Sequence, residues 1–248
     1  MKNIKKLTAL ALVSVVLFTG CKKDKTDPVT TTTNNITTQS TIQATVSLGA
    51  DASILAVLAG SAITNTGATN ITGDMGLSPG TSVGGFPPGN LSGSLHVNDN
   101  IATQAKLDLT AAYNDAAGRT STDMVTLSGN IGGLTLTPGL YKSTSTLAIS
   151  SGDLTFDAKG NANAIFIIQV ASAFTVTSGR QVFLAGGAKA SNIFWQVGSS
   201  ATFGTTVVFK GTIMAMQSIT FDTGATLDGK ALARTGGITM AGNTIVIQ

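Results

Sequence analysis

The sequence predicts an all-β protein, a β-solenoid of triangular section with one long α-helix packed along one face. Three observations lead to this fold class. The composition is rich in Thr and Gly, with 38 and 29 of the 248 residues, and it contains no Glu. Glu, Lys, Leu and Arg dominate helix-rich proteins, whereas Thr favours strands and Gly favours tight turns, so an all-α architecture is excluded. The other two observations are a repeating strand pattern and one stretch of helical periodicity.

The strand pattern recurs four times in the C-terminal half. A first strand, apolar on both sides, is predicted in residues 164–170, 192–197, 212–216 and 230–234. A second strand follows in residues 172–177, 199–204, 217–222 and 236–241, and a short third strand in 181–184, 207–210, 225–228 and 244–247. Three short strands per repeat, with Gly between them, are typical of a solenoid whose coils stack on one another.

The helical periodicity lies in the middle of the chain. Apolar residues recur there at a spacing of three and four, namely Ile101, Ala105, Leu109, Ala112 and Ala116. Asp99 or Asn100 is a suitable N-cap, and Gly118 a suitable stop. A helix of about seventeen residues is about 25 Å long, which spans five or six coils stacked about 4.8 Å apart. Because the first strand of each coil is apolar on both sides, we expect this helix to cover those strands.

The second strands predict a small-residue, nearly uncharged outer surface. Apolar residues such as Phe174 and Val176 alternate with polar ones, so the residues between them face outward. The directly outward column is Thr175, Thr202, Thr220 and Thr239. An earlier column contains Ser172, Ser199, Gln217 and Gly236, and a later column contains Thr177, Gly204, Asp222 and Ala241. We assign two upstream groups to the same columns, namely Ser145, Ala148 and Ser150, and Thr69, Thr72 and Asp74.

The N-terminus predicts export and a lipid anchor. Residues 1–6 are basic, residues 7–18 are apolar but too few to span a bilayer with these flanks, and Phe18-Thr-Gly-Cys21 follows. This pattern resembles a bacterial lipoprotein signal, which implies cleavage before Cys21 and a lipid attached to it. An ordinary signal peptide with an incidental cysteine is the alternative. We therefore expect a signal peptide in residues 1–20, a flexible tether in 21–47 and one domain in 48–248.

Charge argues against a nucleic-acid partner. The sequence pI is about 9.1, but six of the fifteen basic residues lie before Pro28. From Val29 onward the count is nine basic against ten acidic residues. The body of the protein is therefore close to neutral, without the basic stripe that binds nucleic acid.

Catalytic and metal sites have little support in the sequence. Solenoid lyases and hydrolases use clustered carboxylates, and the best candidates here are Asp222, Asp228, Lys210, Lys230 and Arg234. Lys210 and Asp228 occupy equivalent places on successive coils, so a cross-strand ion pair is the simpler interpretation. Asp153 and Asp157 flank a strand as turn residues, and His96 is the only histidine. We expect no catalytic residue, no metal and no cofactor.

The region from residue 48 resembles the large microbial family of ice-binding, or antifreeze, proteins. The matching stretches lie in residues 57–67, 72–80, 85–89, 134–141, 192–197 and 227–233, and include Gly85-Phe-Pro-Pro-Gly89 and Leu134-Thr-Leu-Thr-Pro-Gly-Leu-Tyr141. The resemblance implies a right-handed, discontinuous β-solenoid that binds ice through the exposed second strands. It also implies a Thr-Ala/Gly-x-Thr/Asn pattern there, matched by Ser172-Ala-Phe-Thr175, Ser199-Ser-Ala-Thr202, Gln217-Ser-Ile-Thr220 and Gly236-Gly-Ile-Thr239.

The resulting hypothesis is an ice-binding protein. Its ice-binding residues are predicted to be Thr69, Thr72, Ser145, Ser150, Ser172, Thr175, Thr177, Ser199, Thr202, Thr220 and Thr239. The predicted partner is the ice surface, with membrane contact only through a lipid on Cys21. We expect a monomer outside the cytoplasm, held at the outer membrane or cell surface, or secreted. A surface adhesin or glycan-binding solenoid is the alternative; sugar sites prefer aromatic platforms, and the predicted face has no Trp or Tyr.

Overall fold

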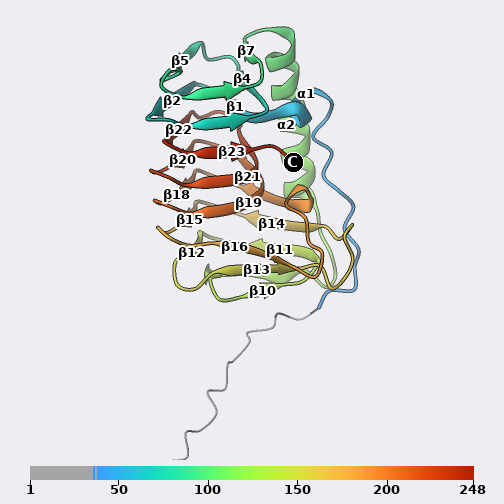
Figure 1. The fold of residues 1–248 in the computed structure, drawn as a ribbon. Coiled ribbons are helices and arrows are strands. Elements are labelled where there is room, and N and C mark those ends of the chain that lie inside the picture. Colours follow the sequence, from blue (N-terminus) through green and yellow to red (C-terminus); the bar gives the residue numbers. More distant parts are fainter. Residues whose placement is uncertain (1–35, 37) are drawn as a thin grey trace, which may run out of the picture. The chain divides into compact units, whose positions relative to one another are not determined.

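The computed structural model describes residue 36 and residues 38–248. The predicted signal peptide, Cys21 and most of the predicted tether lie outside the described residues. The described part of the chain forms a right-handed discontinuous β-solenoid of triangular section, with one long helix along one face, as predicted (Figure 1). All its strand pairs are parallel, and each of the three faces is built from strands of successive coils.

One face carries the second strand of every coil, and we name it the threonine face. Its strands form one sheet in the spatial order β5-β2-β22-β20-β18-β15-β12-β9. Their bounds are β5 (Ser82–Gly84), β2 (Ala62–Thr66), β22 (Ile238–Ala241), β20 (Ile219–Phe221), β18 (Ala201–Phe203), β15 (Phe174–Val176), β12 (Leu147–Ile149) and β9 (Gly129–Asn130).

A second face lies under the long helix, and we name it the helix-covered face. Its strands are β7 (Leu95–Val97), β4 (Asp74–Leu77), β1 (Leu55–Ala59), the second halves of β21 (Thr226–Ala233) and β19 (Val208–Ala215), β17 (Ile193–Val197), β14 (Phe166–Val170), β11 (Gly139–Ser143) and β8 (Val125–Thr126).

The third face holds the remaining strands. They are β6 (Asn90–Ser92), β3 (Asn70–Thr72), β23 (Thr244–Val246), the first halves of β21 and β19, β16 (Val182–Ala185), β13 (Leu154–Asp157) and β10 (Thr135–Leu136). Strands β19 and β21 turn the corner at Gly211 and Gly229, whose φ angles are 109° and 146°. A Cβ at Gly229 would lie 2.1 Å from the carbonyl oxygen of Gly211, so this corner requires glycine.

The coils do not stack in sequence order. Strand β1 pairs with β21, with Val57 opposite Ala231, and β3 pairs with β23, with Ile71 opposite Ile245. The first coils of the chain therefore stack on its last coil. After β7, helix α2 runs along the stacked coils as far as β14, and the chain then continues to β8, which begins the coils that wind back toward β1 (Figure 1).

Helix α2 (Asn100–Gly118) confirms the predicted helix and its N-cap. A carboxylate oxygen of Asp99 accepts a hydrogen bond from the backbone N–H of Ala102 at 2.8 Å. The buried side chains of the helix are Ala102, Ala105, Leu109, Ala112, Tyr113 and Ala116. All of these except Ala102 form one cluster with outward apolar residues of the helix-covered face, among them Leu58, Ile167, Phe194 and Met214. The predicted contact residue Ile101 is only partly buried, because the buried stripe passes through Ala102 instead.

The interior of the solenoid is apolar and contains a cluster of aromatic rings. Trp195 is fully buried, and its ring stacks on Phe174 with centroids 4.8 Å apart. Phe203 stacks on Phe221 at the same distance, and Phe209 lies between the two pairs. These rings fix the inward-pointing positions of successive coils, so the residues between them are held facing outward.

Residues 38–48 run along the body of the solenoid, and we name them the N-terminal strap. The side-chain oxygen of Gln39 accepts a hydrogen bond from the backbone N–H of Leu140 at 2.8 Å. Asp123 accepts hydrogen bonds from the backbone N–H groups of Ser40 and Thr41, at 2.6 and 2.8 Å. A hydrogen bond from the Ser121 hydroxyl, followed by those from Thr41 and Ser40, lowers the pKa of Asp123 well below its usual range. The predicted flexible tether extended to residue 47, whereas contacts with the body already begin at Ile36, which packs against the core, and continue along the strap.

Within the described residues, no helix is both long enough and apolar enough to cross a membrane.

Candidate functional site

The threonine face carries five threonines in register on consecutive strands, and we name them the central column. Pairing places Thr175 opposite Thr202 and Thr202 opposite Thr220. Thr239 follows on β22 and Thr64 on β2. The column continues as Ala148 and Asn130 beyond Thr175, and as Gly84 beyond Thr64. It is straight because the residues on either side of each threonine, such as Ile63 and Ile219, are buried in the core.

Two flanking columns complete the face. In the earlier column, the backbone N–H of Ser199 bonds to the carbonyl of Ser172 at 3.2 Å, and the N–H of Gln217 bonds to the carbonyl of Ser199 at 3.1 Å. The later column contains Thr66, Ala241, Asp222, Gly204, Thr177 and Ser150. Asp222 is the one charged residue in these three columns. The face is therefore made of small, uncharged groups except at one position.

The hydroxyl groups of the central column are available to solvent. Within the described residues, no side-chain hydrogen bond engages the hydroxyl of Thr175, Thr202 or Thr220, while Thr64 donates to Thr239 at 3.2 Å. All five side chains are exposed or half-buried. A β-branched side chain on a strand has few rotamers, so these hydroxyl and methyl groups are held in fixed directions. The column thus presents an ordered row of donors, acceptors and methyl groups to water.

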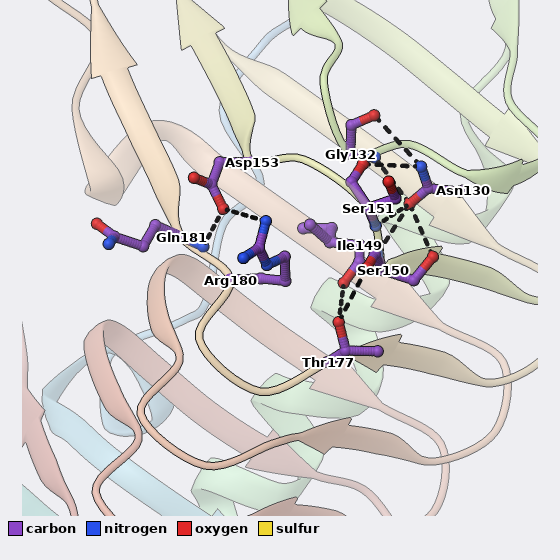
Figure 2. Close-up of polar contacts among 9 residues, drawn as sticks. All are labelled: Asn130, Gly132, Ile149, Ser150, Ser151, Asp153, Thr177, Arg180 and Gln181. Atoms are coloured by element: carbon purple, nitrogen blue, oxygen red, sulfur yellow. Dashed lines mark hydrogen bonds and ion pairs between the residues drawn. The ribbon is translucent and has the colours of Figure 1, made fainter.

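The end of the threonine face near β9 is held by Asn130 (Figure 2). Its side-chain oxygen accepts hydrogen bonds from the backbone N–H of Ser150 at 2.8 Å and from the Ser150 hydroxyl at 3.0 Å, and its amide donates to the carbonyl of Ser151 at 3.0 Å. The Thr177 hydroxyl lies 3.3 Å from the carbonyl oxygens of both Ile149 and Ser150. The hydroxyls of Ser150 and Thr177, both predicted site residues, therefore bond to neighbouring coils.

Most predicted site residues lie on the threonine face. The structure brings together Ser145, Ser150, Ser172, Thr175, Thr177, Ser199, Thr202, Thr220 and Thr239. The placement of Thr69, Thr72 and Asp74 was wrong. Thr69 is fully buried, donates to Asn65 at 2.5 Å and accepts from the N–H of Asn243 at 3.0 Å. Thr72 belongs to β3 on the third face, and Asp74 to β4 on the helix-covered face.

Thr64 is the residue of the central column that sequence reasoning missed. The second strand of the first coil is β2, and β3 is its third strand, so the pattern around Ile71 was assigned to the wrong face. The sequence pattern that identifies Thr64 is Ser61-Ala-Ile-Thr64, which has the same spacing as Ser172-Ala-Phe-Thr175.

Several of the candidate catalytic and metal-binding residues form structural contacts. The ammonium of Lys210 lies 3.2 Å from a carboxylate oxygen of Asp228, in the predicted cross-strand pair. His96 contacts Asp99 at 2.7 Å and lies 3.7 Å from Asp74, at the start of α2. Asp153 pairs with Arg180 at 3.5 Å and accepts from the N–H of Gln181 (Figure 2). In the part of the chain that the structure describes, no group of three or more His, Cys, Asp or Glu residues could hold a metal ion.

Fold and face together define a class of protein: a β-solenoid that presents a regularly spaced array of small hydroxyl groups to solvent. The family model described as Ice-binding-like matches residues 57–246. Since this match covers most of the chain, the protein belongs to the Ice-binding-like family.

Individual relatives agree with this family. An ice-binding protein of Nostoc sp. (strain HG1) is 42% identical over 204 residues, which cover 82% of this chain and 74% of the relative. An ice-binding protein of Flavobacterium frigoris (strain PS1) is 34% identical over 279 residues, covering 100% and 99% of the two chains. The crystal structure of an ice binding protein from an Antarctic biological consortium shares 69% identity and a TM-score of 0.85, over 86% of this chain and 95% of that one.

Proposed function

We propose that the threonine face is the surface with which this protein adsorbs to ice and inhibits ice growth or recrystallisation. The central column carries this proposal: five threonines stand in register on consecutive strands, and the hydroxyls of Thr175, Thr202 and Thr220 are not engaged by other described residues. The relatives and the solved structure that this chain resembles are named as ice-binding proteins, which supports the same role here.

The physical basis is a hydration layer ordered by the face. Side chains in the columns repeat about 4.8 Å apart across the strands and about 6.6 to 6.8 Å apart along them. The methyl groups restrict the waters above them and the hydroxyls hydrogen-bond those waters, so an ice-like layer forms before contact. Because the side chains are already fixed, adsorption costs little conformational entropy. Ice can then advance only as curved fronts between adsorbed molecules, which slows or reshapes the crystal.

A nanolitre osmometer with recorded crystal shape tests this function. We expect the purified protein to produce faceted crystals and a gap between the melting and freezing temperatures. A seed that stays round and grows without restraint would refute ice binding. The alternative is a glycan-binding adhesin. Comparing binding to a glycan array with partition into ice distinguishes the two activities.

We further propose that a lipid on Cys21 anchors the protein outside the cytoplasm, at the outer membrane or cell surface. The support is the sequence Phe18-Thr-Gly-Cys21 after an apolar stretch with basic flanks. Mass spectrometry of the N-terminal peptide should find a diacylglyceryl-modified cysteine, and Cys21→Ser should move the protein from the membrane fraction to the soluble fraction. An unmodified Cys21 in membrane-associated protein would contradict the anchor.

The proposal includes a monomer without catalytic activity. The family is named for ice binding, and two of the five catalytic candidates, Lys210 and Asp228, form an ion pair with each other. Light scattering after size exclusion measures the oligomeric state, and release of reducing or unsaturated sugar ends from polysaccharides tests for activity.

A further inference from the structure

A pocket lies beside the N-terminal strap, on the outer side of the helix-covered face. Three of its lining residues, Phe194, Thr212 and Lys230, stand opposite one another on β17, β19 and β21 and so form one short column. The strap contributes Thr45, Val46 and Leu48 to the wall. The remaining lining residues are Ser53, Ser191, Gly229 and Gln248. The pocket has a volume of about 200 Å³.

Lys230 is the unusual residue of this pocket. Its side chain lies in the wall, and the residue is only 8% exposed. No hydrogen bond or ion pair joins its ammonium to another residue in the described part of the chain, in contrast to Lys106, which donates to the carbonyl oxygens of Ala233 and Arg234. Burial lowers the pKa of Lys230 to about 8. The ammonium is not among the fully buried, unpartnered polar atoms of the described residues, so it opens onto the pocket, where a bound anion would pair with it.

The other lining residues indicate which kind of anion fits the pocket. The hydroxyl of Thr212 lies on the strand next to Lys230, in a residue that is 3% exposed and makes no side-chain hydrogen bond with other described residues. Val46, Leu48 and Phe194 add an apolar surface. A volume of about 200 Å³ suits a small molecule of a few heavy atoms. An inorganic anion would leave the apolar wall in contact with water.

We propose that this pocket binds a small organic monocarboxylate. The carboxylate accepts hydrogen bonds from the Lys230 ammonium and the Thr212 hydroxyl, and a short hydrocarbon part packs on Val46, Leu48 and Phe194. This site involves none of the residues of the central column, so it does not rest on the proposed ice binding.

Isothermal titration of the purified protein with butyrate tests the site, with butyramide as the uncharged ligand of the same shape. Butyrate should bind, and butyramide should bind at least tenfold more weakly, because it cannot pair with the ammonium. Lys230→Met keeps most of the apolar stem and removes the charge, so it should weaken butyrate binding at least tenfold. The control Lys142→Met removes an exposed lysine of β11 and should bind butyrate as the unmodified protein does.

A second measurement keeps the test valid if Lys230→Met fails to fold. Butyrate should raise the pKa of Lys230 in the unmodified protein, as followed by NMR of the side-chain carbon next to the amine. The proposal is overturned if butyrate does not bind, if butyramide or the Lys230→Met variant binds equally well, or if chloride or phosphate binds as tightly as butyrate. Each of these results would be obtained without ice, so they are independent of any result with the threonine face.

Discussion

Replacing Thr220 with Tyr should remove ice binding without unfolding the protein. Thr220 is the middle residue of the central column, between Thr239 and Thr202. The five threonines span four strand spacings, which is about 19 Å at about 4.8 Å per strand. A tyrosine ring at the middle position leaves two threonines on each side, so the longest unbroken row falls to one spacing, about 5 Å. The ring also stands above the plane of the face and holds it away from ice.

The assay is thermal hysteresis together with partition into growing ice. We expect Thr220→Tyr to lose most of both activities, while its melting temperature stays close to that of the unmodified protein, because the Thr220 side chain has no hydrogen-bond partner among the described residues. A change at such an exposed site alters the free energy of unfolding by about 0.5 kcal/mol or less. The matched control is Thr244→Tyr, at an exposed position of β23 on the third face, and it should keep full activity. If Thr220→Tyr stays fully active, or if Thr244→Tyr loses activity equally, the threonine face is the wrong surface.

Two further predictions concern stability. Trp195→Ala should lower the free energy of unfolding by about 3 to 5 kcal/mol, because it opens a cavity among Phe174, Phe209 and Phe156. Urea denaturation measures this loss. A loss of less than about 1 kcal/mol would contradict the observed packing of the Trp195 ring. Burial lowers the pKa of both Lys106 and Lys230 from the ordinary lysine value of 10.5 to about 8, so the unfolded chain binds more protons between these values. The urea midpoint should therefore rise from pH 8 to pH 9.5, and Lys230→Met should reduce that rise; a midpoint that falls over this interval would refute the assignment.

The repeated coils could be predicted from the sequence because they satisfy local rules. In residues 164–247, alternation places Phe174, Phe203 and Phe221 inside, and the structure confirms the strands and their order. Helix α2 was predictable for the same reason, since its apolar spacing and its N-cap lie within one segment. The central column from Thr175 to Thr239 follows directly from these strands.

The first coils could not be placed in this way. Their neighbours are set by pairing between residues far apart in the chain, such as Val57 with Ala231, and no local pattern encodes such a pair. The error at Thr69 and Thr72 has this origin, because an isolated Ile71 flanked by threonines fits a second strand and a third strand equally well. The strap escaped prediction because its contacts come from single side chains without periodicity, such as the carboxylate of Asp123 and the buried Val46.

The stacking of the first coils on the last has a consequence for synthesis. A chain that has left the ribosome only as far as α2 holds β1, β2 and β3 with one edge of each open, since their partners β21, β22 and β23 come at the other end of the sequence. Unpaired edges of this kind attract other strands. The first coils of the nascent chain therefore cannot complete their strand pairing until β21, β22 and β23 have been synthesised, close to the end of the sequence. Folding of this molecule is expected to be slow and post-translational, because its decisive contacts span nearly the whole length of the domain.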